Sequence, residues 1–194
     1  MATATDVSIC SNALLLLGQK PINTLAESTI AQNLWPTVRE AVQRSHPWNC
    51  CISRRVLAPD VEAPAFDWGY KFLLPEDWLR TLQVGESGAE IDYQSEGRYL
   101  LADVTALPLR YVAANEDVAS WDTLLVNAAT YGMAAALAYP VTASASLAQT
   151  MEQKLQLALR EARTIDGQDD PPQTMGDFPL LAARFRGLRT FPRG

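Results

Sequence analysis

Residues 120–165, SWDTLLVNAATYGMAAALAYPVTASASLAQTMEQKLQLALREARTI, contain the strongest structural signal in the chain. No charged residue lies between Asp122 and Glu152. In the first half of this stretch apolar residues recur three or four positions apart, which places them on one side of a helix. Further apolar residues lie on the opposite side of that helix. This pattern predicts a helix that is buried on more than one side. We expect Pro140 to end that helix.

The second half of the stretch is apolar on one face only. Leu147, Met151 and Leu155 share one helical face, whereas Glu152 and Gln156 lie on another, which is typical of a helix with one covered side. The two helices should form an antiparallel hairpin joined by a short turn near Pro140. The run before Pro140 is shorter than the about 20 apolar residues that a bilayer requires. We therefore predict a core helix and no membrane insertion.

Two further helices are expected near the N-terminus. Thr5 or Asp6 can cap the first, over residues 5–18, and Gly18 suits a left-handed residue at its end. Ser28 or Thr29 can cap the second, which Pro36 should kink or split. Its inward face is predicted to be Ile30, Leu34, Val38, Ala41 and Val42, and its outward face Arg39, Glu40, Gln43 and Arg44. Together with the hairpin these helices predict a four-helix bundle-like core.

In the middle third of the chain apolar and polar residues alternate with a period of two, which is typical of strands. The Glu96-Gly97 pair should form a hairpin turn between two of them. The expected strands are residues 48–57, 68–74, 90–94, 98–102 and 107–113. The fold class is therefore α+β, with a helical core over residues 5–46 and 120–166 and a small antiparallel β-sheet inserted at 48–113.

The charge of the chain is unevenly distributed. Its formal net charge is -6, which argues against a protein that coats nucleic acid. Acidic residues dominate up to residue 168, whereas the last eleven residues carry four arginines and no acid. We therefore expect one domain over residues 1–168 and an extended C-terminal arm, residues 169–194, that docks on a partner. The candidate docking residues are Phe178, Arg184, Phe185, Arg186, Arg189 and Phe191.

No catalytic, cofactor-binding or metal-binding group is predicted. Cys10, Cys50 and Cys51 are odd in number, and adjacent residues of a strand point to opposite faces, so we expect no disulfides and a reducing cytoplasm. His46 is the single histidine, and its position after a helix favours a capping or packing role. The spacing of these residues matches no zinc site. Glu76 and Asp77 are expected to form a solvated turn.

Several short strings occur in a characteristic order along residues 7–166. They are ALLLLG (13–18), HPWN (46–49), RRVLA (54–58), WGYKF (68–72), LPEDWLR (74–80), YQSEGR (93–98), LRYV (109–112) and LAYPVT (137–142). This succession resembles the tail tubular protein A family, the head-to-tail adaptors of tailed phages and prophages. Residues after Gly167 match no string of the family.

The resemblance implies a structural virion protein of the tail or neck, assembled in the host cytoplasm. A family adaptor would form a twelve-fold ring under the portal protein, with its sheet insertion facing the tail tube or nozzle and its C-terminal arm on the portal. DNA would contact the protein only as it passes through the channel. An acidic body suits such a channel, because negative walls repel phosphate. Basic and aromatic residues of the arm suit docking in clefts of the portal.

Two other functions are open on the sequence alone. The first is a tail-completion or terminator ring, which would bind the tail and not the portal. The second is a small thiol hydrolase that uses Cys50 or Cys51 with His46. Alkylation of the cysteines would inhibit such an enzyme.

Overall fold

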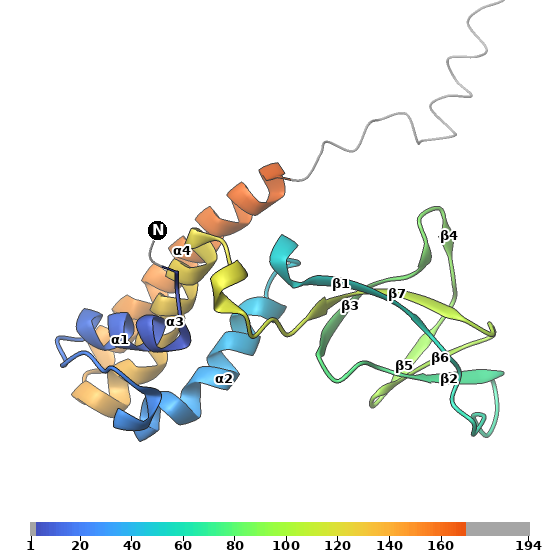
Figure 1. Cartoon of the computed structure of the whole chain (residues 1–194), viewed down its shortest axis with the longest axis horizontal. Helices are drawn as coiled ribbons and strands as arrows, with labels where there is room; N and C mark the ends of the chain where they lie inside the picture. The colour runs from blue at the N-terminus through green and yellow to red at the C-terminus, as the bar shows by residue number, and fades with distance from the viewer. Residues whose placement is uncertain (1–2, 170–194) are drawn as a thin grey trace, which may run out of the picture.

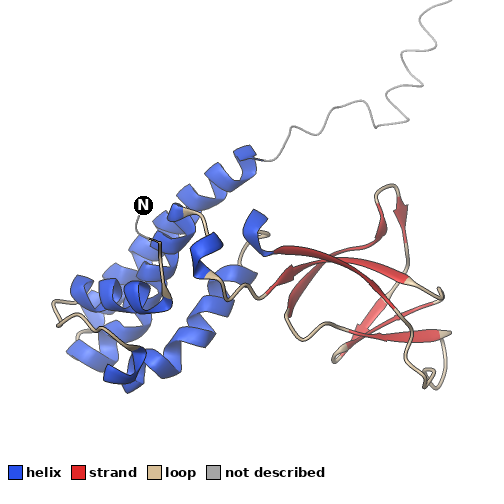
Figure 2. Cartoon of the chain, viewed as in Figure 1, coloured by secondary structure: helices blue, strands red, loops and turns tan. Residues whose placement is uncertain are grey.

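Helices and strands occupy separate halves of the molecule (Figures 1 and 2). The computed structural model describes residues 3–169. Its α-helices are α1 (Asp6–Leu16), α2 (Thr29–Arg44), α3 (Thr123–Thr142) and α4 (Ala145–Asp169). Its strands are β1 (Ile52–Leu57), β2 (Tyr70–Leu73), β3 (Trp78–Glu86), β4 (Ala89–Glu90), β5 (Gln94–Glu96), β6 (Tyr99–Ala102) and β7 (Leu107–Ala113). The α+β class with a segregated sheet region is thus confirmed.

α3 lies at the centre of the helical half and packs against α1, α2 and α4. It continues to Thr142, so the prediction that Pro140 ends it was wrong. Pro140 stands in the last turn, where a proline removes one hydrogen bond and no further turns depend on it. The helix ends at Ala143, which has a φ of 53° and donates its N–H to the Tyr139 carbonyl at 2.9 Å.

By length and composition α3 alone, among the described residues, is sufficient for a membrane span, with 20 residues and a mean hydropathy of 1.3. The same signal arises from a core helix of a globular protein. Here three helices contact it, and Leu125, Met133 and Leu137 are at most 1% exposed. We therefore interpret α3 as a core helix.

The predicted starts of α1 and α2 are confirmed. The Thr5 Oγ1 accepts the Ser8 N–H at 3.1 Å while the Ser8 Oγ accepts the Thr5 N–H at 2.9 Å, which forms a capping box. The Ser28 Oγ accepts the Ala31 N–H at 3.3 Å. Gly18 has the expected positive φ, 73°. α2 is continuous through Pro36, so this proline does not split the helix.

The inward face of α2 was predicted correctly for Leu34, Val38 and Val42, which pack in the core, but wrongly for four other residues. Ile30 and Ala41 are exposed, whereas Arg39 and Gln43 are buried together with Trp35. Trp35 turns this side of the helix inward, because its large ring packs beside that of Trp121, at 6.3 Å between centroids. The polar side chains of Arg39 and Gln43 can be buried on the same side because residues 115 and 116 form hydrogen bonds with them.

Two antiparallel sheets replace the single sheet that was expected. One has the order β1-β7-β3-β4 and the other β2-β6-β5. Their facing sides enclose a second core that includes Phe72, Leu100, Leu109 and Tyr111. The predicted turn at Gly97 connects β5 to β6, as expected.

The longest strand, β3, was not predicted. Register shifts between Trp78 and Arg80 and between Thr81 and Gln83 interrupt its alternation, so that no period of two is visible. β1 also begins later than predicted, because Asn49–Cys51 forms a short 3-10 turn.

The hairpin between β3 and β4 depends on Gly85. This residue has a φ of 95°, and a Cβ there would lie 2.4 Å from the Ala89 carbonyl oxygen. We expect Gly85→Ala to lower the free energy of unfolding by more than about 2 kcal/mol, through strain and overlap together. Denaturant unfolding measures this change.

Gly88→Ala is the matched control for this substitution. Gly88 has a similar φ, 81°, but a Cβ there meets nothing within 4 Å. Gly88→Ala should lower the free energy of unfolding by only about 1 kcal/mol, because it adds the strain of a left-handed backbone without an overlap. Equal effects of the two substitutions would contradict the role of overlap at Gly85.

Candidate functional site

The predicted docking residues of the C-terminal arm, Phe178 to Phe191, lie outside the described residues. Among residues 3–169 no group of three or more His, Cys, Asp or Glu side chains is arranged to hold a metal ion. Within the described residues, the features that could carry a function are therefore exposed side chains, surface hollows and polar contacts in the helical and sheet halves.

His46 connects the end of α2 to α4. Its Nε2 lies 3.1 Å from Oδ2 of Asp166, and its ring meets that of Trp48 edge to face, at 4.7 Å between centroids. Burial lowers the pKa of His46, and the neighbouring Asp166 carboxylate opposes this effect. The second oxygen of Asp166 accepts the Asn49 N–H at 3.1 Å. These contacts give His46 a structural role of the kind that the sequence favoured.

Cys50 and Cys51 face one another, contrary to the expectation of opposite directions. The 3-10 turn brings their sulfur atoms to 3.8 Å, and all three cysteines are free thiols. Hydrogen bonding between the pair and burial raise the pKa of Cys51, and the same contact lowers the pKa of Cys50. Within residues 3–169 the hydrogen-bond partner of the His46 ring is Asp166, and that of the Cys50 sulfur is Cys51.

A polar junction fixes the helical half to the sheets. Arg39 forms an ion pair with Glu116 at 2.7 Å. Gln43, which is fully buried, donates to the Asn115 carbonyl at 2.7 Å and accepts the Asn115 N–H at 3.3 Å. The Asn115 side chain also donates to the Cys50 carbonyl at 2.8 Å. Both ends of the sheet insertion are therefore held at one place.

Asp77 organises the sheet region close to this junction. The Tyr111 hydroxyl donates to its carboxylate at 3.1 Å, and Arg55 pairs with it at 3.6 Å. Burial, and then the contact with Asp77, raises the pKa of Tyr111. The turn was expected to be solvated. This holds for Glu76, which is exposed, and in part for Asp77, whose side chain is 34% exposed.

The end of the sheet region far from the helices exposes apolar side chains. More than half of the side chain is exposed in Val61, Phe66 and Leu73. Tyr70, which is close to them in sequence, is also exposed. A hollow of about 320 Å³ lies against β2, β5 and β6, and Phe66, Trp68 and Tyr99 contribute to its lining. Exposed apolar groups gathered in this way are typical of contact surfaces between proteins.

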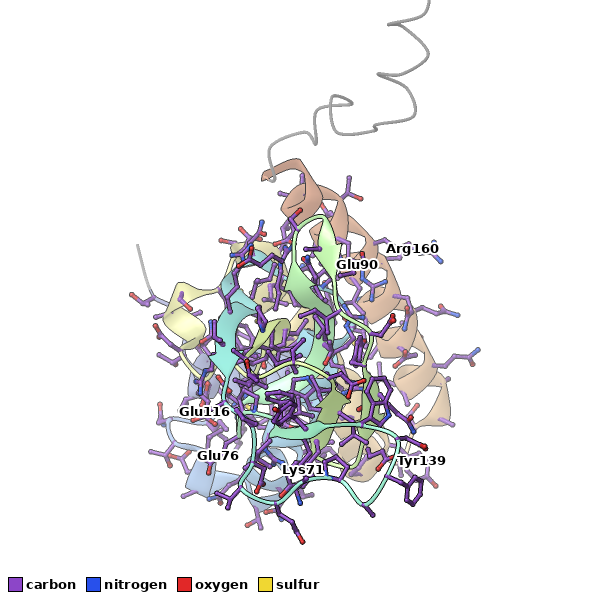
Figure 3. The ribbon with its side chains drawn as sticks, turned by 90° about the vertical axis from the view of Figure 1, so that its right-hand side faces the viewer. Lys71, Glu76, Glu90, Glu116, Tyr139 and Arg160 are labelled. Atoms are coloured by element: carbon purple, nitrogen blue, oxygen red, sulfur yellow. The ribbon has the colours of Figure 1, made fainter. Side chains whose placement is uncertain are left out.

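The four-stranded sheet has edges of opposite charge. β1 forms one edge and carries Arg54 and Arg55, both exposed. β4 forms the other edge, and residues 86–92 around it contain three exposed acids, Glu86, Glu90 and Asp92, and no base. In Figure 3 Glu90 lies at the upper end of the sheet region, well apart from Lys71 of β2 near its lower end. These edges had no signal in the sequence, because strand order determines them.

Comparisons of the chain with protein-family models and with curated proteins found no match.

Proposed function

We propose that the chain is a structural head-to-tail adaptor of a tailed phage or prophage, which forms a ring that joins the portal to the tail and lets DNA pass. One observation carries the proposal: strings of the family that are far apart in sequence meet in space. Asp77 of LPEDWLR contacts Tyr111 of LRYV and Arg55 of RRVLA. The strings thus lie in one structural unit, and this supports the proposal.

The architecture suits this function. In our proposal the four helices form a bundle-like core that builds the ring, and the sheet region projects from it toward the tail tube or nozzle. The exposed apolar side chains at the far end of the sheets, Val61, Phe66 and Leu73, provide a surface for that contact. The arm, residues 169–194, reaches the portal. The adaptor needs no cofactor and acts in the virion without a membrane.

The test is to mix the full-length chain with isolated portal protein and with isolated tail tube, and to examine each mixture by electron microscopy. We expect a ring of density, with the twelve-fold symmetry of the portal, added to its tail-facing side. Binding to the tail tube without binding to the portal would instead identify a tail-completion or terminator ring. Binding to neither would reject both functions.

A further inference from the structure

The adjacent thiols of Cys50 and Cys51 differ in their access to solvent. Their sulfur atoms lie 3.8 Å apart, within the 3-10 turn Asn49–Cys51. Cys51 is 2% exposed, whereas Cys50 is partly exposed. A reagent from solvent can therefore reach the Cys50 sulfur, while the buried Cys51 thiol stays beside it as a hydrogen-bond partner.

Cys50 lines a surface hollow of about 260 Å³ between the turn, the start of α3 and the C-terminal half of α4. Asn49 and Ser120 also line it and are exposed, so the hollow is open to solvent. A cavity of about 150 Å³ is large enough for benzene. The hollow therefore has room for a small group attached to the Cys50 sulfur.

Cys51 favours the reactive form of Cys50. The thiolate, and not the thiol, is the nucleophile in thiol chemistry. The hydrogen bond from Cys51 lowers the pKa of Cys50, while burial and the Asp166 carboxylate oppose this effect. Burial raises the pKa of Cys10 to about 12. The contact with Cys50, and then burial, raises the pKa of Cys51. Cys50 is therefore the thiol that ionises most readily of the three.

The charge of the hollow determines which reagents it favours. Asp122 and Asp166 both line it, and no Lys, Arg or His is among the described residues that do so. Asp166 is bonded to the His46 ring and to the Asn49 N–H, which hold its carboxylate in place. Carboxylates in the lining attract a cation and repel an anion. A disulfide that carries amino groups therefore suits the hollow better than one that carries carboxylates.

We infer that Cys50 is a modification site for small cationic disulfides, and that Cys51 activates it as a hydrogen-bond donor. The Cys50 thiolate attacks one sulfur of the reagent, which forms a disulfide bond to Cys50 and breaks the disulfide bond of the reagent. The other half of the reagent leaves as a thiolate, which takes up the proton that Cys50 released to solvent. The reagent is the only oxidant required. The attached group would lie at the polar junction, where the Cys50 carbonyl accepts a hydrogen bond from Asn115.

The mixed disulfide should persist without closing to a Cys50–Cys51 disulfide. Consecutive Cα atoms are about 3.8 Å apart, whereas those joined by a disulfide usually lie about 4.4–6.8 Å apart, so a disulfide between neighbours is strained. In addition, the Cys51 thiol that would have to attack ionises less readily. This modification involves no residue of the arm and is independent of the proposed adaptor function.

Cystamine, a small disulfide with two amino groups, tests the site in the full-length reduced protein. The reaction is stopped with acid at several times, and tandem mass spectrometry gives the modified fraction of each cysteine. We expect Cys50 to react at least about tenfold faster than Cys10 or Cys51. Glutathione disulfide, which is anionic, should react more slowly than cystamine. Each rate is divided by the rate of the same reagent with the chain unfolded in urea, which removes differences in intrinsic reactivity.

Substitutions of Cys51 test its activating role. Cys51→Ala removes the donor, so less Cys50 is ionised at neutral pH, and its exchange should slow by roughly threefold or more. The pH at which the rate is half-maximal should shift upward, which a merely structural role of Cys51 would not cause. Cys51→Ser supplies an O–H donor and should restore both. Cys10→Ala is the matched control and should leave the rate at Cys50 unchanged.

The pH profile is measured above neutral pH. The other titratable groups near Cys50 are Asp122 at the start of α3, Asp166 of α4 and His46, which is bonded to Asp166. Burial lowers the pKa of His46, so its ring is already neutral in this range. A shift of the profile on substitution of Cys51 therefore reports the ionisation of Cys50.

Equal rates at the three cysteines, or a faster reaction at Cys10, would overturn the inference. So would a faster normalised reaction of glutathione disulfide than of cystamine, or a rate and a pH profile that Cys51→Ala leaves unchanged. Reaction at Cys50 only in urea would show that the hollow is closed in the folded chain, and closure to a Cys50–Cys51 disulfide would show that Cys51 is a second nucleophile. Either result also rejects the inference. Circular dichroism melting establishes that each variant is folded.

Discussion

Truncation after Gln168 is expected to abolish binding to the portal and to leave the melting temperature nearly unchanged. The described cores of both halves are built from residues between Ile9 and Ala162, which the truncated protein retains. The removed segment contains the basic and aromatic residues that we propose to dock on the portal. A pull-down with portal protein and a thermal melt measure the two effects.

Substitutions within the arm refine this test. Replacing Phe185 and Phe191 by alanine removes the proposed anchors, and replacing Arg184, Arg186 and Arg189 by lysine preserves charge but removes bidentate hydrogen bonding. Both variants should bind the portal more weakly than the full chain. Undiminished binding by the truncated protein would refute a docking role for the arm.

Trp48→Ala should cause the largest loss of stability among single substitutions at the junction, about 3–5 kcal/mol. The Trp48 side chain is 2% exposed, and its indole N–H donates to the Val42 carbonyl at 3.0 Å. Its ring also supports His46 between α2 and the start of the sheets. Alanine would leave a cavity and remove the indole hydrogen bond, while the Val42 carbonyl would keep its bonds from Ser45. Urea unfolding measures the change.

Two tryptophan variants act as controls for this prediction. Trp48→Phe retains most of the packing and should lose mainly the hydrogen bond, about 1 kcal/mol. Trp68→Ala lies at the far end of the sheet region, where its indole makes one exposed hydrogen bond of 3.3 Å to Gln94, and should cost about 1 kcal/mol or less. A loss at Trp68 as large as that at Trp48 would contradict the central role of the junction.

Local signals in the sequence predicted much of the fold. The caps at Thr5 and Ser28, the long uncharged helix and the turn at Gly97 each depend on a few neighbouring residues. Each was placed correctly, except that the helix continues past Pro140 to Thr142. The α+β class followed from the change of period in the middle third. These features need no knowledge of what packs against them.

Features that depend on distant partners were not predictable in this way. The inward turn of Arg39 and Gln43 requires residues 115 and 116, more than 70 positions away, and no periodicity reveals such a pairing. Strand β3 was hidden by its register shifts, and the charge of the two sheet edges appears only once the strand order is known. The contact between Cys50 and Cys51 required the turn that replaces the first residues of the expected strand.

The paired ends of the sheet region have an evolutionary consequence. Ile52 lies opposite Val112, so the chain leaves the helices and returns to them at neighbouring positions. An inserted unit with adjacent entry and exit can be lengthened, shortened or exchanged without rerouting the helices that carry it. One helical frame can therefore acquire new distal surfaces through changes confined to residues 52–113, while the helices that carry them stay unchanged.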